Sequence, residues 1–359
     1  MTKHWRKDLK VGNVMIGEDH PVVFIAEIAC EHQGSLEVAK SMAMAIKDIQ
    51  EATGRNLIIK FQLHISENEL VPGTIKFWAG KLEDVLSRVN LEPPEKHIEL
   101  MNFCKEIGIQ YMCTPFDIKT TEVLHKLGCP AFKVGSGELT NLPMHKYLAE
   151  VCAREGKSVI FSTGMCELHE IDETAKIYRD AGAINWGMAN CDSLYPPEYH
   201  EVRLGMIEVL KRKFGDVVIG HSDHTNTIYT GLGAVAKGAR FIEKHITIHR
   251  GLHGPDVAVS LEVQEFEELV RGGMAVEAAL GSKKVVTSGE KEIRRWASHW
   301  VVADEKIKKS SKIMPSMITA KRCGGRGKIP AKDIERLYGK IINKDLEKNH
   351  FLSWDDIEK

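Results

Sequence analysis

Eight short runs rich in β-branched and aromatic residues recur along the chain, each followed by a turn and then by a segment of helical periodicity. They lie at residues 22–27, 57–62, 110–113, 131–134, 158–162, 184–188, 217–221 and 241–245. Strands that alternate with helices are typical of a parallel sheet with helical crossovers. Eight such units predict a closed (β/α)8 barrel, and an open doubly wound sheet is the alternative with the same number of strands.

The segments between these runs predict the helices of the barrel. One helix is expected after Ser35, a candidate N-cap, because the apolar residues that follow form a single stripe. Others are expected at about residues 94–107, 143–154, 168–181, 201–214 and 261–280. The less regular segment 66–91 is expected to close one end of the barrel.

The composition changes after Leu280, which indicates a second unit. The charged stretch SKKVVTSGEKEIRRW is typical of a linker or an extended arm. Short apolar strands around KRCGGRGKIP follow, too few for a large core but sufficient for a small domain. The expected organisation is a barrel at 1–282, a linker at 283–298 and a small β-rich domain at 299–359.

Charge and cysteine content narrow the class of protein. The 359 residues carry 49 Lys and Arg against 50 Asp and Glu, so no overall basic field favours a nucleic-acid partner. The eight cysteines lie mainly in apolar runs without a CxxC pair, as expected of buried thiols in a reducing compartment. Neither a signal-peptide core nor a run of about 18 apolar residues is present, so we expect a cytoplasmic protein without a membrane partner.

Polar side chains end nearly every predicted strand. In a closed barrel, the loops that follow the C-terminal ends of the strands build the active site. These polar residues are Glu27, Lys60, Gln62, Thr114, Lys133, Ser136, Glu138, Ser162, Ser193, Tyr195, Ser222, His224 and His245. The sequence therefore predicts a functional site at this rim.

Two lysines within apolar strands predict an anion site. Lys60 lies in IIKFQ and Lys133 in FKVGSGE, where an unpaired charge would be costly, although each is a solvated surface lysine on the alternative interpretation. Hydroxyls of Thr114, Ser136 and Ser162 add donors, and a phosphate group fits such a set. The Gly-Ser-Gly turn alone is weak support, because such turns often only join a strand to a helix.

Two histidines at the ends of adjacent strands predict a metal site. His224 and His245 can converge on one cation, although a single barrel histidine is more often structural. Two nitrogens without a cysteine ligand favour octahedral Mn²⁺, with Mg²⁺ or Co²⁺ as alternatives, over a closed zinc site. Glu243 shares a strand face with His245, and Asp256 is a further carboxylate near the rim or, alternatively, a turn residue.

Nine segments taken in order resemble the sialic acid synthase family, the phosphoenolpyruvate-dependent synthases of nonulosonic acids. They are AEIACEHQGSLEVAK, IIKFQ, CTPFD, FKVGSGELTNLP, IFSTGM, LYP, SDHT, IEKHIT and GPD. The tail KRCGGRGKIPAKDIERLYGK is similar to the small antifreeze-like (SAF) domain that follows the barrel in those enzymes. The resemblance extends over essentially the whole chain.

The resemblance implies a role for each rim residue. Phosphoenolpyruvate would be bound by Lys60, Thr114, Lys133, Ser136, Ser162, Ser193 and Ser222. Mn²⁺ would lie between His224 and His245. An open-chain N-acylated hexosamine would meet Glu27, Gln62, Glu138, Tyr195 and Asp256, together with Arg322 from the other subunit of a domain-swapped homodimer. Lys60, Lys133, Glu138 and the two histidines would be catalytic, with Glu138 the first candidate for proton transfer.

Two positions depart from the family pattern. Glu31 stands in EHQG where the family usually has NHNG, and Cys323 stands in KRCG where the family usually has KRPG. Other readings are a metal-dependent aldolase or a sugar-phosphate condensing enzyme related to the octulosonate synthases, and a non-catalytic carbohydrate-binding protein. The tail with Arg322 disfavours the first, and the presence of both lysines and both histidines disfavours the second.

Overall fold

The computed structural model describes residues 8–77 and 80–358. The chain divides after Gly281 into two compact units. In the described part of the chain, no helix combines the length and the apolar character that crossing a membrane requires.

The first unit is a closed barrel of parallel strands, which confirms the predicted fold. Each strand pairs with its neighbour in chain order, and β12 pairs with both β11 and β3 to close the ring. The strands are β3 (Val23–Ala29), β4 (Leu57–Leu63), β7 (Gln110–Pro115), β8 (Ala131–Val134), β9 (Ser158–Ser162), β10 (Trp186–Cys191), β11 (Val218–Asp223) and β12 (Phe241–Thr247). The sixth barrel strand, β10, starts two residues later than predicted, and Ile184, the predicted start, is exposed.

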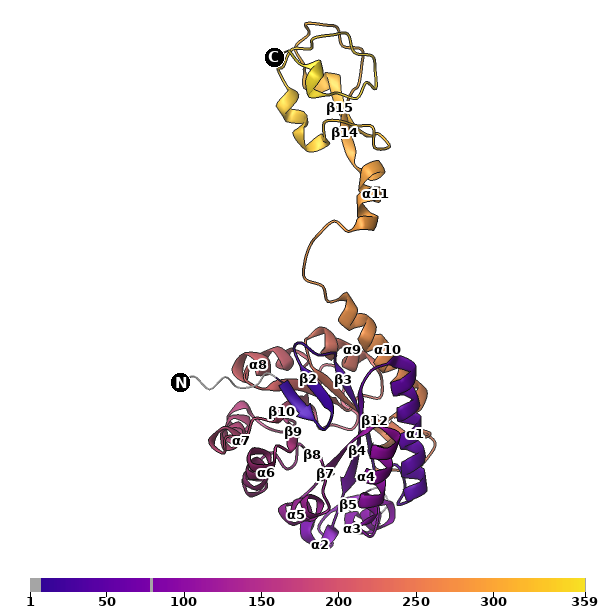
Figure 1. Cartoon of the computed structure of the whole chain (residues 1–359), viewed down its shortest axis with the longest axis vertical. Helices are drawn as coiled ribbons and strands as arrows, with labels where there is room; N and C mark the ends of the chain where they lie inside the picture. The colour runs from indigo at the N-terminus through magenta and orange to yellow at the C-terminus, as the bar shows by residue number, and fades with distance from the viewer. Residues whose placement is uncertain (1–7, 78–79, 359) are drawn as a thin grey trace. The chain divides into compact units, whose positions relative to one another are not determined.

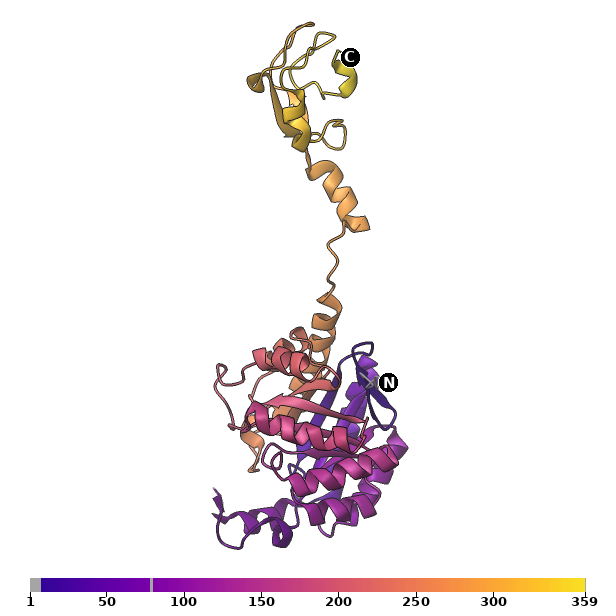
Figure 2. The ribbon, with the colours of Figure 1, turned by 90° about the vertical axis from the view of Figure 1, so that its left-hand side faces the viewer.

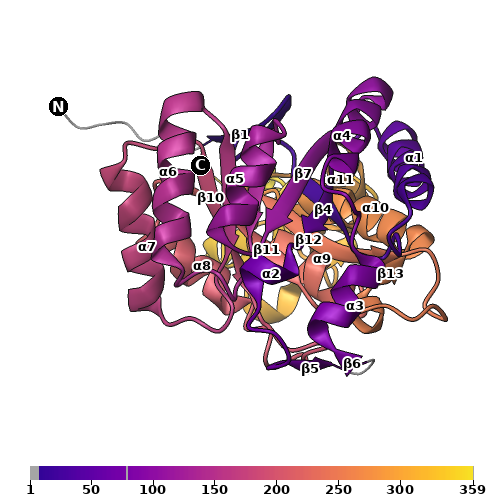
Figure 3. The ribbon, with the colours of Figure 1, turned by 90° about the horizontal axis from the view of Figure 1, so that it is seen from below.

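Helices surround the strands, as Figures 1 and 3 show. They are α1 (Leu36–Thr53), α4 (Lys96–Ile107), α5 (Ile118–Lys126), α6 (Leu142–Glu155), α7 (Leu168–Asp180), α8 (Gly205–Lys213), α9 (Tyr229–Ala236) and α10 (Val263–Ala279). The Ser35 hydroxyl caps α1 by accepting from the Val38 amide at 3.3 Å, as its sequence indicated. Helices α5 and α9 were not predicted. In α9, Gly231 and Gly233 weaken the helical pattern, but a side chain at Gly231 would collide with Leu269 of α10.

The strands alternate between two apolar layers. Outward residues such as Phe24 and Ile242 pack against the helices, and inward residues such as Ile25 and Phe241 fill the N-terminal half of the barrel. An unpredicted hairpin, β1 (Asp8–Val11) with β2 (Val14–Gly17), closes that end through the buried side chains of Leu9, Val11, Val14 and Ile16. The C-terminal half of the barrel is therefore the end left for polar side chains.

The segment expected to close one end lies after β4. It contains α2 (Ser66–Glu69), the antiparallel strands β5 (Lys76–Phe77) and β6 (Gly80–Lys81), and α3 (Leu82–Val89). A further short strand, β13 (Leu261–Glu262), lies later in the chain and pairs with β12. The Gly34 backbone amide donates to the Val89 carbonyl at 2.9 Å, and the Asn90 side-chain Nδ2 donates to the His64 carbonyl at 2.6 Å. These bonds attach the segment to the loops after β3 and β4, at the C-terminal rim.

The second unit has its own core. Strands β14 (His299–Ala303) and β15 (Ile318–Arg322) pair antiparallel, and short 3-10 turns lie at Pro315–Met317, Ala331–Leu337 and Trp354–Asp356. Its buried side chains include Val301, Ile307, Ile313, Ile329, Leu337, Ile342, Leu346 and Leu352. Helix α11 (Ser288–Ala297), visible ahead of β14 in Figure 2, forms where a linker was expected, because Thr287 and Glu290 build a capping box.

Candidate active site

The C-terminal half of the barrel contains a cavity of about 280 Å³. Thirteen of the predicted rim residues line it, from Glu27 on β3 to His245 on β12. Asp256 lies just outside the lining, with its Oδ2 3.8 Å from His245 Nδ1. Arg322 ends β15 in the second unit and is exposed. A larger cavity of about 480 Å³ lies at the other end of the barrel beside Asn13, and amides and apolar groups dominate its lining.

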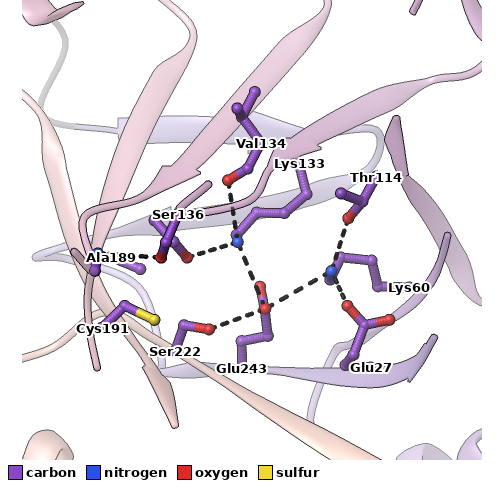
Figure 4. A network of polar contacts seen from close by, with 12 residues as sticks. Glu27, Lys60, Thr114, Lys133, Val134, Ser136, Ala189, Cys191, Ser222 and Glu243 are labelled. Atoms are coloured by element: carbon purple, nitrogen blue, oxygen red, sulfur yellow. Dashed lines mark hydrogen bonds and ion pairs between the residues drawn. The ribbon is translucent and has the colours of Figure 1, made fainter. Parts of the chain in front are cut away.

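The floor of the cavity is a network of opposite charges (Figure 4). The Lys60 ammonium forms an ion pair with Glu27 and donates to Thr114 Oγ1 at 2.8 Å. The Lys133 ammonium donates to Ser162 Oγ at 2.6 Å. Both ammonium groups flank one oxygen of Glu243, at 3.7 Å for Lys60 and 3.6 Å for Lys133. The two predicted lysines therefore meet at one carboxylate.

Burial and mutual charge set the ionisation of this floor. Burial lowers the pKa of Lys60 to about 8, with Glu243 opposing the shift and Lys133 adding to it. Burial alone would raise the pKa of Glu243, but the Lys133 and Lys60 charges hold it below its usual range. The carboxylate is therefore ionised at neutral pH, and it is 3% exposed.

Glu243 was not assigned a role from the sequence. The signal that could have found it is its place two residues before His245, because alternate strand residues share a face. Ser222 donates to Glu243 Oε1 at 3.0 Å from the neighbouring strand β11. The contacts of Glu243 with Ser222, Lys133 and Lys60, which lie 21 to 183 positions away in the chain, could not be predicted from sequence spacing alone.

The two predicted metal ligands are neighbours. The ring centroids of His224 and His245 are 5.4 Å apart, and both side chains are buried. His224 Nδ1 donates to the Asp192 carbonyl, and its Nε2 lies 3.0 Å from the Tyr195 hydroxyl. His245 Nδ1 is buried without a hydrogen-bond partner. Burial, reinforced by His224, lowers the pKa of His245 well below its usual range, so its imidazole is neutral, as a metal ligand must be.

The donor set fits an open metal site rather than a closed one. Within residues 8–77 and 80–358, no group of three or more His, Cys, Asp or Glu side chains is arranged to hold a metal ion. Two adjacent imidazoles, one with an unpartnered nitrogen, leave most of an octahedral coordination sphere to water or substrate.

A carboxylate side of the rim adjoins the histidines. Burial and the nearby Glu69 raise the pKa of Glu138 to about 7. Gln62 Oε1 lies 3.2 Å from His64 Nε2, and His64 Nδ1 lies 2.9 Å from Glu69 Oε2, so His64 links Gln62 to Glu69. The Tyr195 ring stacks on His224 with centroids 4.2 Å apart. Glu138, Gln62 and Tyr195 all line the cavity and contribute a carboxyl group, an amide and a hydroxyl to it.

The two departures from the family pattern lie outside the lysine floor. Glu31 accepts hydrogen bonds from Thr247 Oγ1 and the Asp256 amide, each at 3.3 Å, and its pKa is raised to about 7 by burial and by Asp256. It therefore faces the loop that carries Asp256. A side chain at Gly254 would lie 2.6 Å from a Glu31 oxygen, so it would displace the Glu31 carboxyl group. Cys323 is buried in the second unit, with Sγ 3.3 Å from the Lys321 carbonyl.

Comparison with known proteins identifies the family of the chain. The model of the NeuB family matches residues 38–285. N,N'-diacetyllegionaminic acid synthase of Campylobacter jejuni is 33% identical over 341 residues, 92% of this chain and 98% of that protein. Human N-acetylneuraminate-9-phosphate synthase is 33% identical over 339 residues, 93% and 92% of the two chains. The structure of N-acetylneuraminic acid synthetase from Leptospira borgpetersenii with citrate has a TM-score of 0.70 at 29% identity, covering 81% of this chain and 96% of that one. The chain therefore belongs to the NeuB family of sialic acid synthases.

Proposed function

We propose that this enzyme condenses phosphoenolpyruvate with an open-chain N-acylated hexosamine, such as N-acetylmannosamine or a deoxy or amino derivative, to give a nonulosonic acid and phosphate. Its relatives are nonulosonic acid synthases, which supports the product class. The observation that carries the proposal is the meeting of Lys60 and Lys133 in one cavity with the histidine pair.

The two lysines on the floor of the cavity support binding of a substrate with two anionic groups. Lys60 and Lys133 provide positive charge, and the hydroxyls of Thr114, Ser136, Ser162, Ser193 and Ser222 line the same cavity. Ser193 Oγ is buried without a partner, so it retains hydrogen-bonding capacity for a ligand. Such a set can hold both the phosphate and the carboxylate of phosphoenolpyruvate.

The histidine pair supports a divalent cation, with Mn²⁺ the expected ion. His224 and His245 would hold it through neutral imidazole nitrogens. When bound, the ion would supply Lewis-acid polarisation of the acceptor aldehyde. We expect His224→Ala and His245→Ala each to abolish Mn²⁺-dependent turnover while circular dichroism stays unchanged. Retained activity in either variant would remove that histidine from the metal site.

The chain's own groups account for the remaining steps. The lysines orient phosphoenolpyruvate so that its C3 attacks the aldehyde carbon, whose oxygen becomes a hydroxyl. Water then adds to C2, and Glu138 accepts one of its protons and passes it to the former aldehyde oxygen. The bond between C2 and the phosphate oxygen breaks, and the remaining proton of the C2 hydroxyl goes to the departing phosphate, which leaves a ketone and inorganic phosphate. Glu27, Gln62, Tyr195 and Asp256 would contact the acceptor.

Exposed apolar side chains on the rim support a covering subunit. Met165, Tyr199 and Tyr229 are 72%, 56% and 68% exposed, and they lie in the loops after β9 and β10 and at the start of α9 after β11. Large apolar groups on adjacent loops favour a protein partner. We propose that the small domain of a second copy covers this rim in a domain-swapped homodimer and brings Arg322 to the acceptor.

The test follows phosphate release and product mass with phosphoenolpyruvate, Mn²⁺ and a panel of acceptors. The panel contains N-acetylmannosamine, its 6-deoxy and 4-amino derivatives, and arabinose 5-phosphate. We expect release only with an N-acylated hexosamine, and a product heavier than the acceptor by one pyruvate unit. Release without a sugar, or only with the pentose phosphate, would refute the proposal. Arg322→Ala should raise KM for the hexosamine more than KM for phosphoenolpyruvate.

A further inference from the structure

Four charged side chains meet on the cavity floor and their formal charges cancel. Lys60 and Lys133 contribute two positive charges, and Glu27 and Glu243 contribute two negative charges. All four residues are at most 3% exposed. A site that must attract phosphate thus carries no net charge from these four residues, which requires an explanation.

The contacts of Glu243 differ from those of the other groups. Its distances of 3.6 and 3.7 Å to the two ammonium nitrogens exceed hydrogen-bond length, so it acts on them by charge. An ammonium has three donors. Lys60 uses two on Glu27 and Thr114, and Lys133 uses two on Ser162 and the Val134 carbonyl. One donor of each lysine is left for an incoming anion.

Only one oxygen of the Glu243 carboxylate is hydrogen-bonded in the described part of the chain. Ser222 donates to the same oxygen, Oε1, that faces both lysines. The other oxygen, Oε2, is buried without a hydrogen-bond partner in the described part of the chain. The carboxylate is therefore held in place by Ser222 and by the attraction of the two ammonium groups, close to where a ligand phosphate would bind.

We propose that Glu243 is a resident counter-anion of the phosphate site, which holds Lys60 and Lys133 in position when the site is empty and limits its affinity for phosphate. Without this carboxylate, two buried ammonium groups would face an anion with one compensating charge, and product phosphate would dissociate slowly. With it, the incoming phosphate gains two charge-assisted hydrogen bonds but meets a fixed repulsion. The inference rests on the proposed function, because it assigns phosphate as the product to be released.

The test compares the full-length wild type with Glu243→Gln by titration calorimetry with inorganic phosphate. The titration is made at pH 6, below the pKa of about 8 for Lys60, so that this lysine keeps its proton when Glu243 is lost. We expect Glu243→Gln to bind phosphate about tenfold more tightly, the order of effect of one unit charge removed near a partly buried anion. In turnover, product inhibition by phosphate should strengthen and kcat should fall, while KM for phosphoenolpyruvate should not rise.

Glu31→Gln is the matched control. It replaces another buried acidic side chain of the same rim, one that faces Thr247 and Asp256 rather than the lysines and, with a pKa of about 7, is mostly protonated at pH 6. Its phosphate affinity should equal that of the wild type. If Glu243→Gln does not fold, the same titration is made with Glu243→Asp. The shorter side chain moves the negative charge away from both lysines, so phosphate should bind a few-fold more tightly than to the wild type.

Equal or weaker phosphate binding by the folded Glu243→Gln, or by Glu243→Asp in its place, would overturn the inference. The calorimetric result is independent of turnover. If no acceptor supports phosphate release but Glu243→Gln still tightens phosphate binding, the proposed function fails and the counter-anion role stands. If turnover proceeds as proposed and the affinity does not change, only the counter-anion role fails.

Discussion

Buried lysines lie on both faces of the same barrel wall. On the outer face, Lys244 is fully buried, with its ammonium 3.2 Å from Asp223 Oδ2, 3.2 Å from Thr225 Oγ1 and in contact with the Thr225 carbonyl. These three contacts use all three donors. On the inner face, Lys60 and Lys133 each keep one donor unused beside Glu243. A buried lysine is thus structural where its donors are all satisfied, and available for binding where they are not.

The largest expected effect is the loss of turnover when a lysine of the inner face is replaced. Lys133→Met removes a charge and a donor that we assign to the phosphate site, so turnover should fall by about 10³-fold or more. Stability should fall less than when a buried carboxylate loses its only cation, because Glu243 keeps Lys60 and Ser222 as partners when Lys133 is lost. The measurements are phosphate release at saturating substrates and the urea midpoint. A variant that loses stability in proportion to its activity would assign Lys133 to the structural class.

The reverse outcome is expected on the outer face. Lys244→Met leaves the buried Asp223 carboxylate without its cation, and breaking one partner of such a pair costs about 3–5 kcal/mol. The free energy of unfolding from urea denaturation should fall by that amount, while kcat of the folded fraction stays near wild type. A stability within about 1 kcal/mol of wild type would show that hydrogen bonds from Thr225 and Thr230 suffice for Asp223.

The contrast also marks what the sequence could reveal. Lys60 and Lys133 were predictable because a charge inside an apolar strand requires a reason, and strand alternation places it inward. The partners of these lysines were not, because Glu243 meets them through barrel closure rather than through spacing. The β1–β2 hairpin was missed since four-residue strands carry little periodicity, and α9 since its glycines serve close packing. The barrel itself follows from repeated local patterns, whereas the floor of the site depends on contacts across the ring.

Glu138, another buried charge of the cavity, predicts how the rate depends on pH. Burial and Glu69 raise the pKa of Glu138 to about 7, and the role of proton acceptor that we propose for it requires the ionised form. The rate should therefore rise with pH through about 7. Glu138→Gln should lose this rise and lower kcat by roughly 10²-fold. A pH–rate profile from 5.5 to 8.5 measures both; an unchanged rising limb in the variant would assign the ionisation to another group. Lys244→Met serves as a control whose profile should match wild type.

Glu31 tests whether a buried group on the rim contributes to stability or reduces it. Its folded-state pKa of about 7 exceeds the usual 4.5, because burial and Asp256 disfavour the charge. Between these values the unfolded chain ionises while the folded protein keeps its proton, so stability falls as pH rises through this window. Glu31→Gln removes the ionisation, and its free energy of unfolding should exceed that of wild type by roughly 3 kcal/mol at pH 8. The difference should shrink as the pH falls through this window and disappear only below about 4.5, where Glu31 is protonated in both the folded and the unfolded state. If Glu31→Gln is instead less stable at pH 8, the hydrogen bonds that Glu31 accepts from Thr247 and Asp256 outweigh its desolvation, and Glu31 belongs with Lys244 among the structural charges.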